Sequence, residues 1–160
     1  MAFRRKKEST PEGAYRSALN TLGRADCTEK RLKEKLTERG YSDGDAEQAI
    51  GALENEGLLN DERSFARRAS YYAEVYRFGR ARIRLELEKK GYARDLIDQR
   101  LGEAIGEIDF RENCLLFAKK KRLSFPTDEK EKRKVVSSLV RGGYSFSEIR
   151  YALDKLKNES

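Results

Sequence analysis

The stretch LKEKLTERGYSDGDAEQAI, residues 32–50, recurs as IRLELEKKGYARDLIDQRL at residues 83–101 and as VVSSLVRGGYSFSEIRYAL at residues 135–153. The copies align without gaps on a Gly-Tyr pair, which stands at Gly40-Tyr41, Gly91-Tyr92 and Gly143-Tyr144. Each copy follows the previous one after 51 or 52 residues. A period of this length indicates a chain built from tandem structural repeats.

The apolar residues of the copies keep the same register. Leu36, Leu87 and Leu139 share one position, and apolar residues recur at intervals of three to four on both sides of the Gly-Tyr pair. This spacing predicts two helices per copy, each with one buried face. The glycine follows a segment that ends in Lys, Arg or Gly, so we expect it to close the first helix in a left-handed conformation. Asp43 or Asp45, and Ser145 or Ser147, are the expected N-caps of the helices that follow.

A further helix is expected before each pair, at residues 11–24, 61–76 and 109–123, with Pro11 in a first helical turn. Its apolar stripe in the second copy is Phe65, Ala66, Ala69, Tyr72, Ala73 and Tyr76, and in the third copy Phe110, Cys114, Phe117 and Ala118. Ser124 to Thr127 break the helical pattern and predict the longest connection.

The sequence therefore predicts an all-α protein of three tandem three-helix repeats of about 50 residues each. A basic flexible N-terminus at 1–10 is followed by repeats at 11–58, 59–107 and 108–160. A repeat of this size buries about 60% of its chain surface and is marginal alone, so neighbouring repeats should pack on each other. We expect an elongated, curved molecule.

The composition narrows the function classes. The chain has 160 residues, no His, and 35 basic against 28 acidic residues, a net charge of +7. Without His, the commonest general base and metal ligand are missing, so we expect no enzyme, no cofactor and no metal site. Cys27 and Cys114 are expected to be reduced, and no apolar run is long enough for a membrane span or a signal peptide. These features predict a cytoplasmic protein.

Charges of one sign are grouped along the chain. Residues 43–62 carry seven acidic and no basic side chains, whereas residues 77–94 carry seven basic and two acidic ones. Arg77, Arg80 and Arg84 have the spacing of one helix face, and residues 119–122 and 130–134 extend the positive character. Such grouping creates a field that attracts polyanions or an acidic protein surface. The candidate binding residues are Arg77, Arg80, Arg82, Arg84, Lys89, Lys90, Lys119, Lys120, Lys121 and Arg122.

Two of these interpretations have alternatives. The charged blocks can also be ordinary solvated helix faces, and the acidic block can be a docking surface or a helix N-terminal bias. Tyrosines can stack on nucleic-acid bases, but Tyr41, Tyr92 and Tyr144 recur with the turn, which favours a structural role. The cluster of Tyr71, Tyr72, Tyr76 and Phe78 allows a mixed core and binding role.

Three segments together resemble the RecX regulatory proteins: GLLNDERSFA at residues 57–66, FGRARI at 78–83, and 87–91 ending in Lys90-Gly91. The first repeat, from Ala18-Leu19 to Gly40, is similar to the N-terminal segment of that family. The resemblance covers residues 14–157. Asn60 stands where Asp is usual, Ser64 separates Arg63 from Phe65, and the third repeat matches loosely.

The resemblance implies tandem three-helix repeats and a cytoplasmic modulator of the RecA recombinase. Such a protein lies in the groove of the RecA filament on single-stranded DNA and suppresses strand exchange, ATP hydrolysis and SOS coprotease activity. We expect the protein to be a monomer. Weak non-specific DNA binding is expected beside it, because the chain is basic. The alternative is a stand-alone helix-turn-helix DNA-binding module, which the acidic helix at residues 43–54 disfavours because phosphates would repel it.

Overall fold

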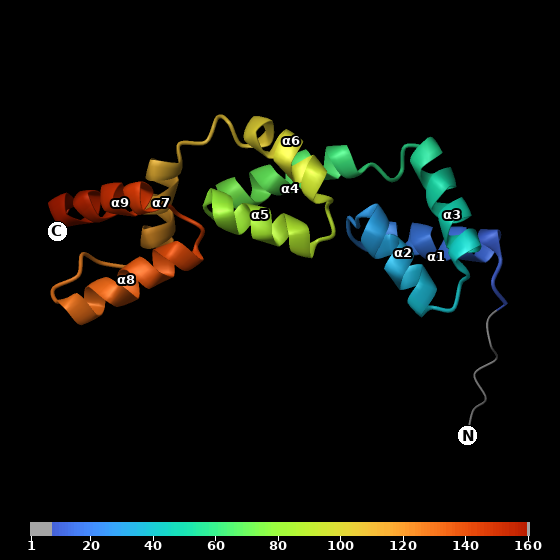
Figure 1. Cartoon of the computed structure of the whole chain (residues 1–160), viewed down its shortest axis with the longest axis horizontal. Helices are drawn as coiled ribbons and strands as arrows, with labels where there is room; N and C mark the ends of the chain where they lie inside the picture. Colours follow the sequence, from blue (N-terminus) through green and yellow to red (C-terminus); the bar gives the residue numbers. More distant parts are fainter. Residues whose placement is uncertain (1–7, 160) are drawn as a thin grey trace, which may run out of the picture. The chain divides into compact units, whose positions relative to one another are not determined.

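The computed structural model describes residues 8–159, which contain nine α-helices and no strand (Figure 1). The helices are α1 (Pro11–Arg24), α2 (Glu29–Glu38), α3 (Asp43–Asn55), α4 (Asp61–Glu74), α5 (Arg80–Lys89), α6 (Arg94–Ala104), α7 (Phe110–Lys120), α8 (Glu129–Arg141) and α9 (Phe146–Glu159). They form three successive groups of three, so the all-α class and the repeat are confirmed. The expected flexible segment at 1–10 lies mostly outside the described residues.

The helices pack into two compact units. Unit 1 is the described chain through Ser64 together with Lys90–Tyr92, and unit 2 is Phe65–Lys89 with the chain from Ala93 onward. In unit 1, α1 lies against α3, and in unit 2, α7 lies against α9. The turn Lys90–Tyr92 thus belongs to unit 1, although the helices on either side of it belong to unit 2.

Equivalent apolar positions of the repeats form the cores of the two units. Leu36, Leu87 and Leu139 are all fully buried, as the register of the sequence predicts. Each such side chain contributes about 1.5 to 3 kcal/mol to folding by leaving water. Burial also extends to the tyrosines of the three turns, Tyr41, Tyr92 and Tyr144. Their structural role is therefore confirmed, since a side chain buried in the fold cannot stack on a base.

The three turns close their helices as expected. Gly40, Gly91 and Gly143 have φ values of 96°, 98° and 97°. In this left-handed region a side chain would clash with the backbone, so glycine is the favoured residue. The N-cap of α3 is Ser42, whose hydroxyl accepts from the Asp45 amide. The expectation of Asp43 or Asp45 is wrong, because both lie in the first turn of the helix.

Two helices are shorter than the sequence predicts. The α4 helix ends at Glu74 instead of residue 76, and α7 spans Phe110–Lys120 instead of 109–123. Arg77 and Arg122, with φ values of 58° and 57°, are the positive-φ residues other than glycine among residues 8–159. After α7 the Leu123 amide donates to the Ala118 carbonyl, so Arg122 takes the place that glycine usually has after a helix.

The apolar stripe of the third repeat is buried as predicted, but that of the second repeat is narrower than expected. Phe65, Ala69, Tyr72 and Ala73 are buried on α4, whereas Ala66 and Tyr76 are exposed. Tyr76 lies beyond the end of α4, so the helical spacing no longer directs its side chain to the core. Its ring instead stacks on Phe78 at 5.3 Å.

Candidate nucleic-acid interface

Arg77, Arg80 and Arg84 do not share a helix face. Because α5 begins at Arg80, Arg77 lies in the connection between α4 and α5. The Arg80 guanidinium is 3.0 Å from the Glu148 carboxylate, and that of Arg84 is 2.6 Å from the Asp98 carboxylate. The prediction of one projecting row of three arginines is therefore wrong, and reversing these charges would disturb internal contacts.

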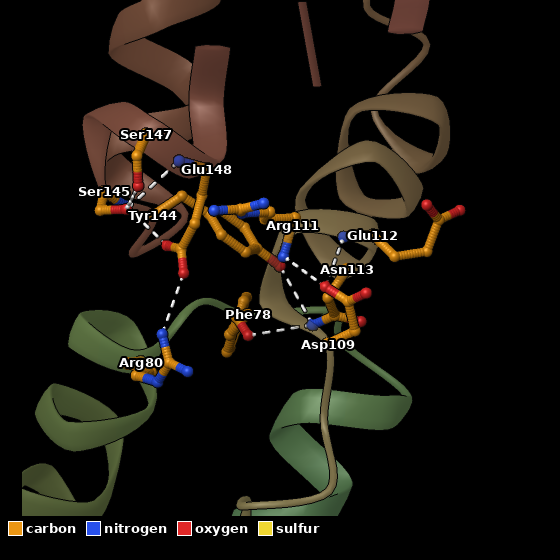
Figure 2. A network of polar contacts seen from close by, with 10 residues as sticks. All are labelled: Phe78, Arg80, Asp109, Arg111, Glu112, Asn113, Tyr144, Ser145, Ser147 and Glu148. Carbon is orange, nitrogen blue, oxygen red and sulfur yellow. Dashed lines mark hydrogen bonds and ion pairs between the residues drawn. The ribbon is translucent and has the colours of Figure 1, made fainter. Parts of the chain in front are cut away.

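Arg80 takes part in the network that holds the start of α9. The Glu148 carboxylate accepts from the Ser145 amide at 2.8 Å and from Arg80, while the Glu148 amide donates to the Ser145 hydroxyl (Figure 2). Ser145 and Glu148 thus form a capping box, whose Ser-x-x-Glu spacing is visible in the sequence. The ring of Phe110 lies 4.3 Å from the Arg80 guanidinium carbon. Arg80 therefore has a structural role inside unit 2.

Asn113 anchors the connection that contains Arg77. Its amide nitrogen donates to the Ala73 carbonyl oxygen at 3.0 Å. It also lies within hydrogen-bond distance of the Phe78 carbonyl oxygen, at 3.3 Å, and of the Tyr144 hydroxyl, at 3.1 Å (Figure 2). Its carbonyl oxygen accepts from the Arg77 guanidinium at 3.2 Å. Burial raises the pKa of the Tyr144 phenol, which donates to the Arg77 carbonyl. The sequence carries no local signal for Asn113, because its partners are 31 to 40 residues away.

Arg82 and Lys89 on α5 share the Glu86 carboxylate, whereas Lys90 lies in the turn after the helix. Arg82 binds the Glu86 carboxylate at 2.8 Å and the Arg141 carbonyl at 3.1 Å. Lys89 lies 3.5 Å from Glu86, and the exposed Lys90 belongs to unit 1, where its carbonyl oxygen accepts from Thr28. Arg82 and Lys89 therefore take part in local ion pairs, and the binding role of these three cations stays a prediction.

The run Lys119–Arg122 lies at the C-terminal end of α7, where cations complement the helix dipole. Lys119 pairs with Glu159 at 3.1 Å. The Lys120 ammonium donates to the Val75 carbonyl at 2.8 Å and lies 5.5 Å from the centre of the Tyr76 ring. The fold of unit 2 thus brings Lys120 of this basic run to the aromatic cluster at the end of α4, although Lys120 and Val75 are 45 residues apart in sequence.

Tyr71 and Tyr76 are the exposed members of that cluster, at 49% and 42% exposure, and their rings meet edge to face at 5.3 Å. We call Tyr71, Tyr76, Lys120, Lys121 and Arg122 the α7-end surface. Aromatic rings beside cations suit a nucleic-acid strand, because bases stack on the rings while phosphates pair with the cations. The sequence predicts both halves of this surface but not their contact.

The thiols offer no evident chemistry. Cys27 and Cys114 are both outside disulfides. Burial, with a smaller contribution from the charge of Glu148, raises the pKa of Cys114 to about 12, so this thiol stays protonated at neutral pH. Among residues 8–159, no cluster of three acidic or cysteine side chains has the geometry for a metal ion. The helices described here are also too short and too polar to cross a bilayer.

Comparison with known proteins places the chain in a family. A protein named regulatory protein RecX from Trichlorobacter lovleyi is 30% identical over 148 residues, which cover 91% of this chain and 96% of the relative. The chain belongs to the RecX family of regulatory proteins. A RecX protein from Vibrio parahaemolyticus is 33% identical over 150 residues, covering 92% of this chain and 94% of the relative.

Further comparisons agree with the RecX assignment. A family model described as the first three-helix domain of RecX matches residues 14–53, which hold most of α1 together with α2 and nearly all of α3. The crystal structure of RecX from Lactobacillus salivarius has a TM-score of 0.74 at 22% identity, covering 92% of this chain and 97% of that one. A second RecX crystal structure has a TM-score of 0.73 at 23% identity, covering 90% of this chain and 71% of that one. These two likenesses concern the fold.

Proposed function

We propose that this protein binds the RecA–DNA filament and inhibits its strand exchange, ATP hydrolysis and coprotease activity. The observation that carries the proposal is the α7-end surface on a chain of the RecX family, since Lys120 of a basic run lies beside the exposed Tyr76 ring there. A filament presents both single-stranded DNA and protein, so such a surface can contact phosphates or acidic side chains there.

The protein would inhibit by occupying binding sites on the filament and not by catalysing a reaction. It has no His, and the Cys114 thiol is held protonated, so the usual nucleophile and general base are missing. We propose a cytoplasmic monomer that takes part in the regulation of homologous recombination and the SOS response. Inhibition by occupancy should saturate once the sites on the filament are filled.

The deciding experiment compares two targets at matched salt. The protein is sedimented with RecA filaments on single-stranded DNA and, separately, with the same naked DNA. We expect co-sedimentation with filaments at physiological salt and weak binding to naked DNA. On naked DNA, the logarithm of the binding constant should fall linearly with the logarithm of the salt concentration. The slope should be about 0.7 per phosphate contact.

The alternative function predicts the opposite preference between DNA and filament. A stand-alone helix-turn-helix module would bind duplex DNA with sequence selectivity at physiological salt and would ignore RecA. Preference for a particular duplex over the filament would replace our proposal with this one. The acidic first turn of α3, with Asp43 and Asp45, disfavours that outcome because a recognition helix meets phosphates near its N-terminus.

A further inference from the structure

The first two repeats share an ion pair between their second and third helices. The Lys33 ammonium on α2 is 2.7 Å from the Glu47 carboxylate on α3. The Arg84 guanidinium on α5 is 2.6 Å from the Asp98 carboxylate on α6. Both pairs occupy the same two positions of the gapless alignment, so they are one feature repeated. In each case the ion pair connects the second and third helices of the repeat.

The third repeat lacks this bridge. The aligned positions hold Val136 on α8 and Arg150 on α9, so an apolar residue replaces the cation and a cation replaces the acid. Within residues 8–159 the structure gives Arg150 no acidic partner. In place of the bridge lies an open groove of about 610 Å³ that both residues line. We call it the α8–α9 groove.

The longest connection of the chain forms one wall of the groove. Eight residues, 121–128, join α7 to α8, whereas four, 25–28, join α1 to α2. Phe125 and Pro126 from the longer connection line the groove together with Leu153. At its edge Phe146, the first residue of α9, is 73% exposed, the largest exposure among the large apolar residues that the structure describes. A bulky side chain in such a position gains free energy when a partner covers it.

We propose that the α8–α9 groove binds a segment of a partner protein in which a bulky apolar side chain stands next to an acidic residue. The apolar side chain contacts Val136, Phe146 and Leu153. The carboxylate pairs with Arg150, which stands where the other repeats carry their acidic partner. This binding site is separate from the α7-end surface and does not depend on the RecA assignment.

The charges around the groove favour a peptide over a nucleic acid. Lys132 and Lys157 add to the positive side near Arg150, but Asp128, Glu129 and Asp154 also line the groove. Consecutive phosphates could not avoid these three carboxylates, whereas a peptide can place one carboxylate at Arg150 and leave the rest of the rim in water. The volume fits a few side chains, within the usual range of ligand sites of about 300 to 1,000 Å³.

The chain itself supplies the test variant. Val136→Lys with Arg150→Glu rebuilds the ion pair that the first two repeats carry at these positions, so this double variant should fold. Random-sequence peptides displayed on phage are selected on the full chain. We expect enriched peptides that combine Phe, Leu, Ile or Trp with a neighbouring Asp or Glu, and a loss of affinity of about tenfold or more on the double variant.

Two single variants separate the roles of charge and apolar contact. Arg150→Glu keeps the apolar groove and reverses its charge, so selection on it should enrich Lys or Arg beside the apolar residue. Phe146→Ser changes a side chain that is mostly in water, so folding should be intact while peptide affinity falls about fivefold or more. Circular dichroism checks the fold of each variant.

Several results would overturn the proposal. These are a selection that yields no enriched peptides, enriched peptides without acidic residues, and undiminished binding to the double variant. Displacement of the peptides by single-stranded DNA would assign the groove to nucleic acid. A concentration-dependent dimer in sedimentation equilibrium that the double variant abolishes would assign it to a second copy of this chain.

Discussion

The Thr28 hydroxyl donates a hydrogen bond of 2.9 Å to the carbonyl oxygen of Lys90. One repeat later, at the aligned positions, the Gly79 amide donates to the carbonyl oxygen of Gly142 at 2.7 Å. In both cases the donor precedes the second helix of a repeat and the acceptor precedes the turn glycine of the next repeat. The Gly-Tyr turn therefore has two roles, since it closes its own helix and also contacts the preceding repeat.

These two roles make different demands on the turn glycines. Gly40 and Gly143 have nearly equal φ values, 96° and 97°. A Cβ on Gly40 would meet nothing within 4 Å, whereas one on Gly143 would clash with the Arg82 amide nitrogen. We expect Gly40→Ala to cost about 1 to 2 kcal/mol, for the left-handed backbone alone. Gly143→Ala should cost about 1 to 3 kcal/mol more, because backbone atoms must separate.

Urea unfolding of the two variants, followed by circular dichroism, measures this difference. Gly91→Val provides a third case, since a Cβ there would lie 2.7 Å from the Thr28 hydroxyl oxygen and β-branching adds to the strain. Equal losses at Gly40 and Gly143 would show that the contact with the preceding repeat adds nothing to stability.

The fold could be predicted from the sequence because its signals are local. The register of Leu36 and Tyr41 within one repeat specifies helix, turn and burial, and two further copies repeat the specification. The binding residues could not be predicted in the same way. Arg77 follows a helix that ends through contacts with Asn113 and Tyr144, which are distant in sequence. Because Arg77 and not glycine has the positive φ after α4, the sequence does not indicate where this helix ends.

A pair of carboxylates in unit 1 predicts a dependence on pH. Burial raises the pKa of Glu29, and the charge of Glu54 raises it further. A raised pKa in the folded state means that this site favours folding at low pH and loses its contribution as the pH rises through that pKa. Glu54→Gln should therefore stabilise the protein at pH 7, by less than about 1 kcal/mol because both residues are exposed and water screens their repulsion. The gain should vanish near pH 3.

Thermal melts across this pH range test the pair, with Glu107→Gln as the control. Glu107 is exposed in the connection after α6, so its substitution should leave the melting temperature unchanged at every pH. A gain from Glu54→Gln that persists at pH 3 would assign the effect to helix propensity instead of repulsion between carboxylates.

Two ion pairs of α5, Arg80 with Glu148 and Arg84 with Asp98, should respond differently to charge reversal. In the first pair the Arg80 side chain is 62% exposed but Glu148 only 9%, whereas Arg84 and Asp98 are 43% and 60% exposed. Arg80→Glu places a second carboxylate beside a nearly buried one, so we expect a loss of about 1 to 3 kcal/mol. Arg84→Glu should cost no more than about 1 kcal/mol, since water screens the exposed pair. Similar losses in urea titrations of both variants would contradict a structural role for Arg80.

Arg122 offers the sharpest test of the proposed function, because replacing it by glycine should raise stability but weaken binding. It is an exposed arginine at a φ of 57°, a backbone region that costs a side chain about 1 to 2 kcal/mol. Arg122→Gly removes this strain and should raise stability by about 1 kcal/mol. The same change removes a cation from the α7-end surface, so inhibition of RecA ATP hydrolysis should weaken, most clearly at low salt.

The control for Arg122→Gly is Lys130→Ala, which removes one exposed cation from the first turn of α8, outside the α7-end surface. Both variants have the same net charge, so a general loss of attraction to the filament would weaken them equally. If Arg122 contacts the filament, the more stable Arg122→Gly protein should be the weaker inhibitor, whereas Lys130→Ala should inhibit like the parent. An Arg122→Gly protein that is stabilised and inhibits fully would remove the α7-end surface from the binding site. Loss of one of its cations would then have no effect on inhibition.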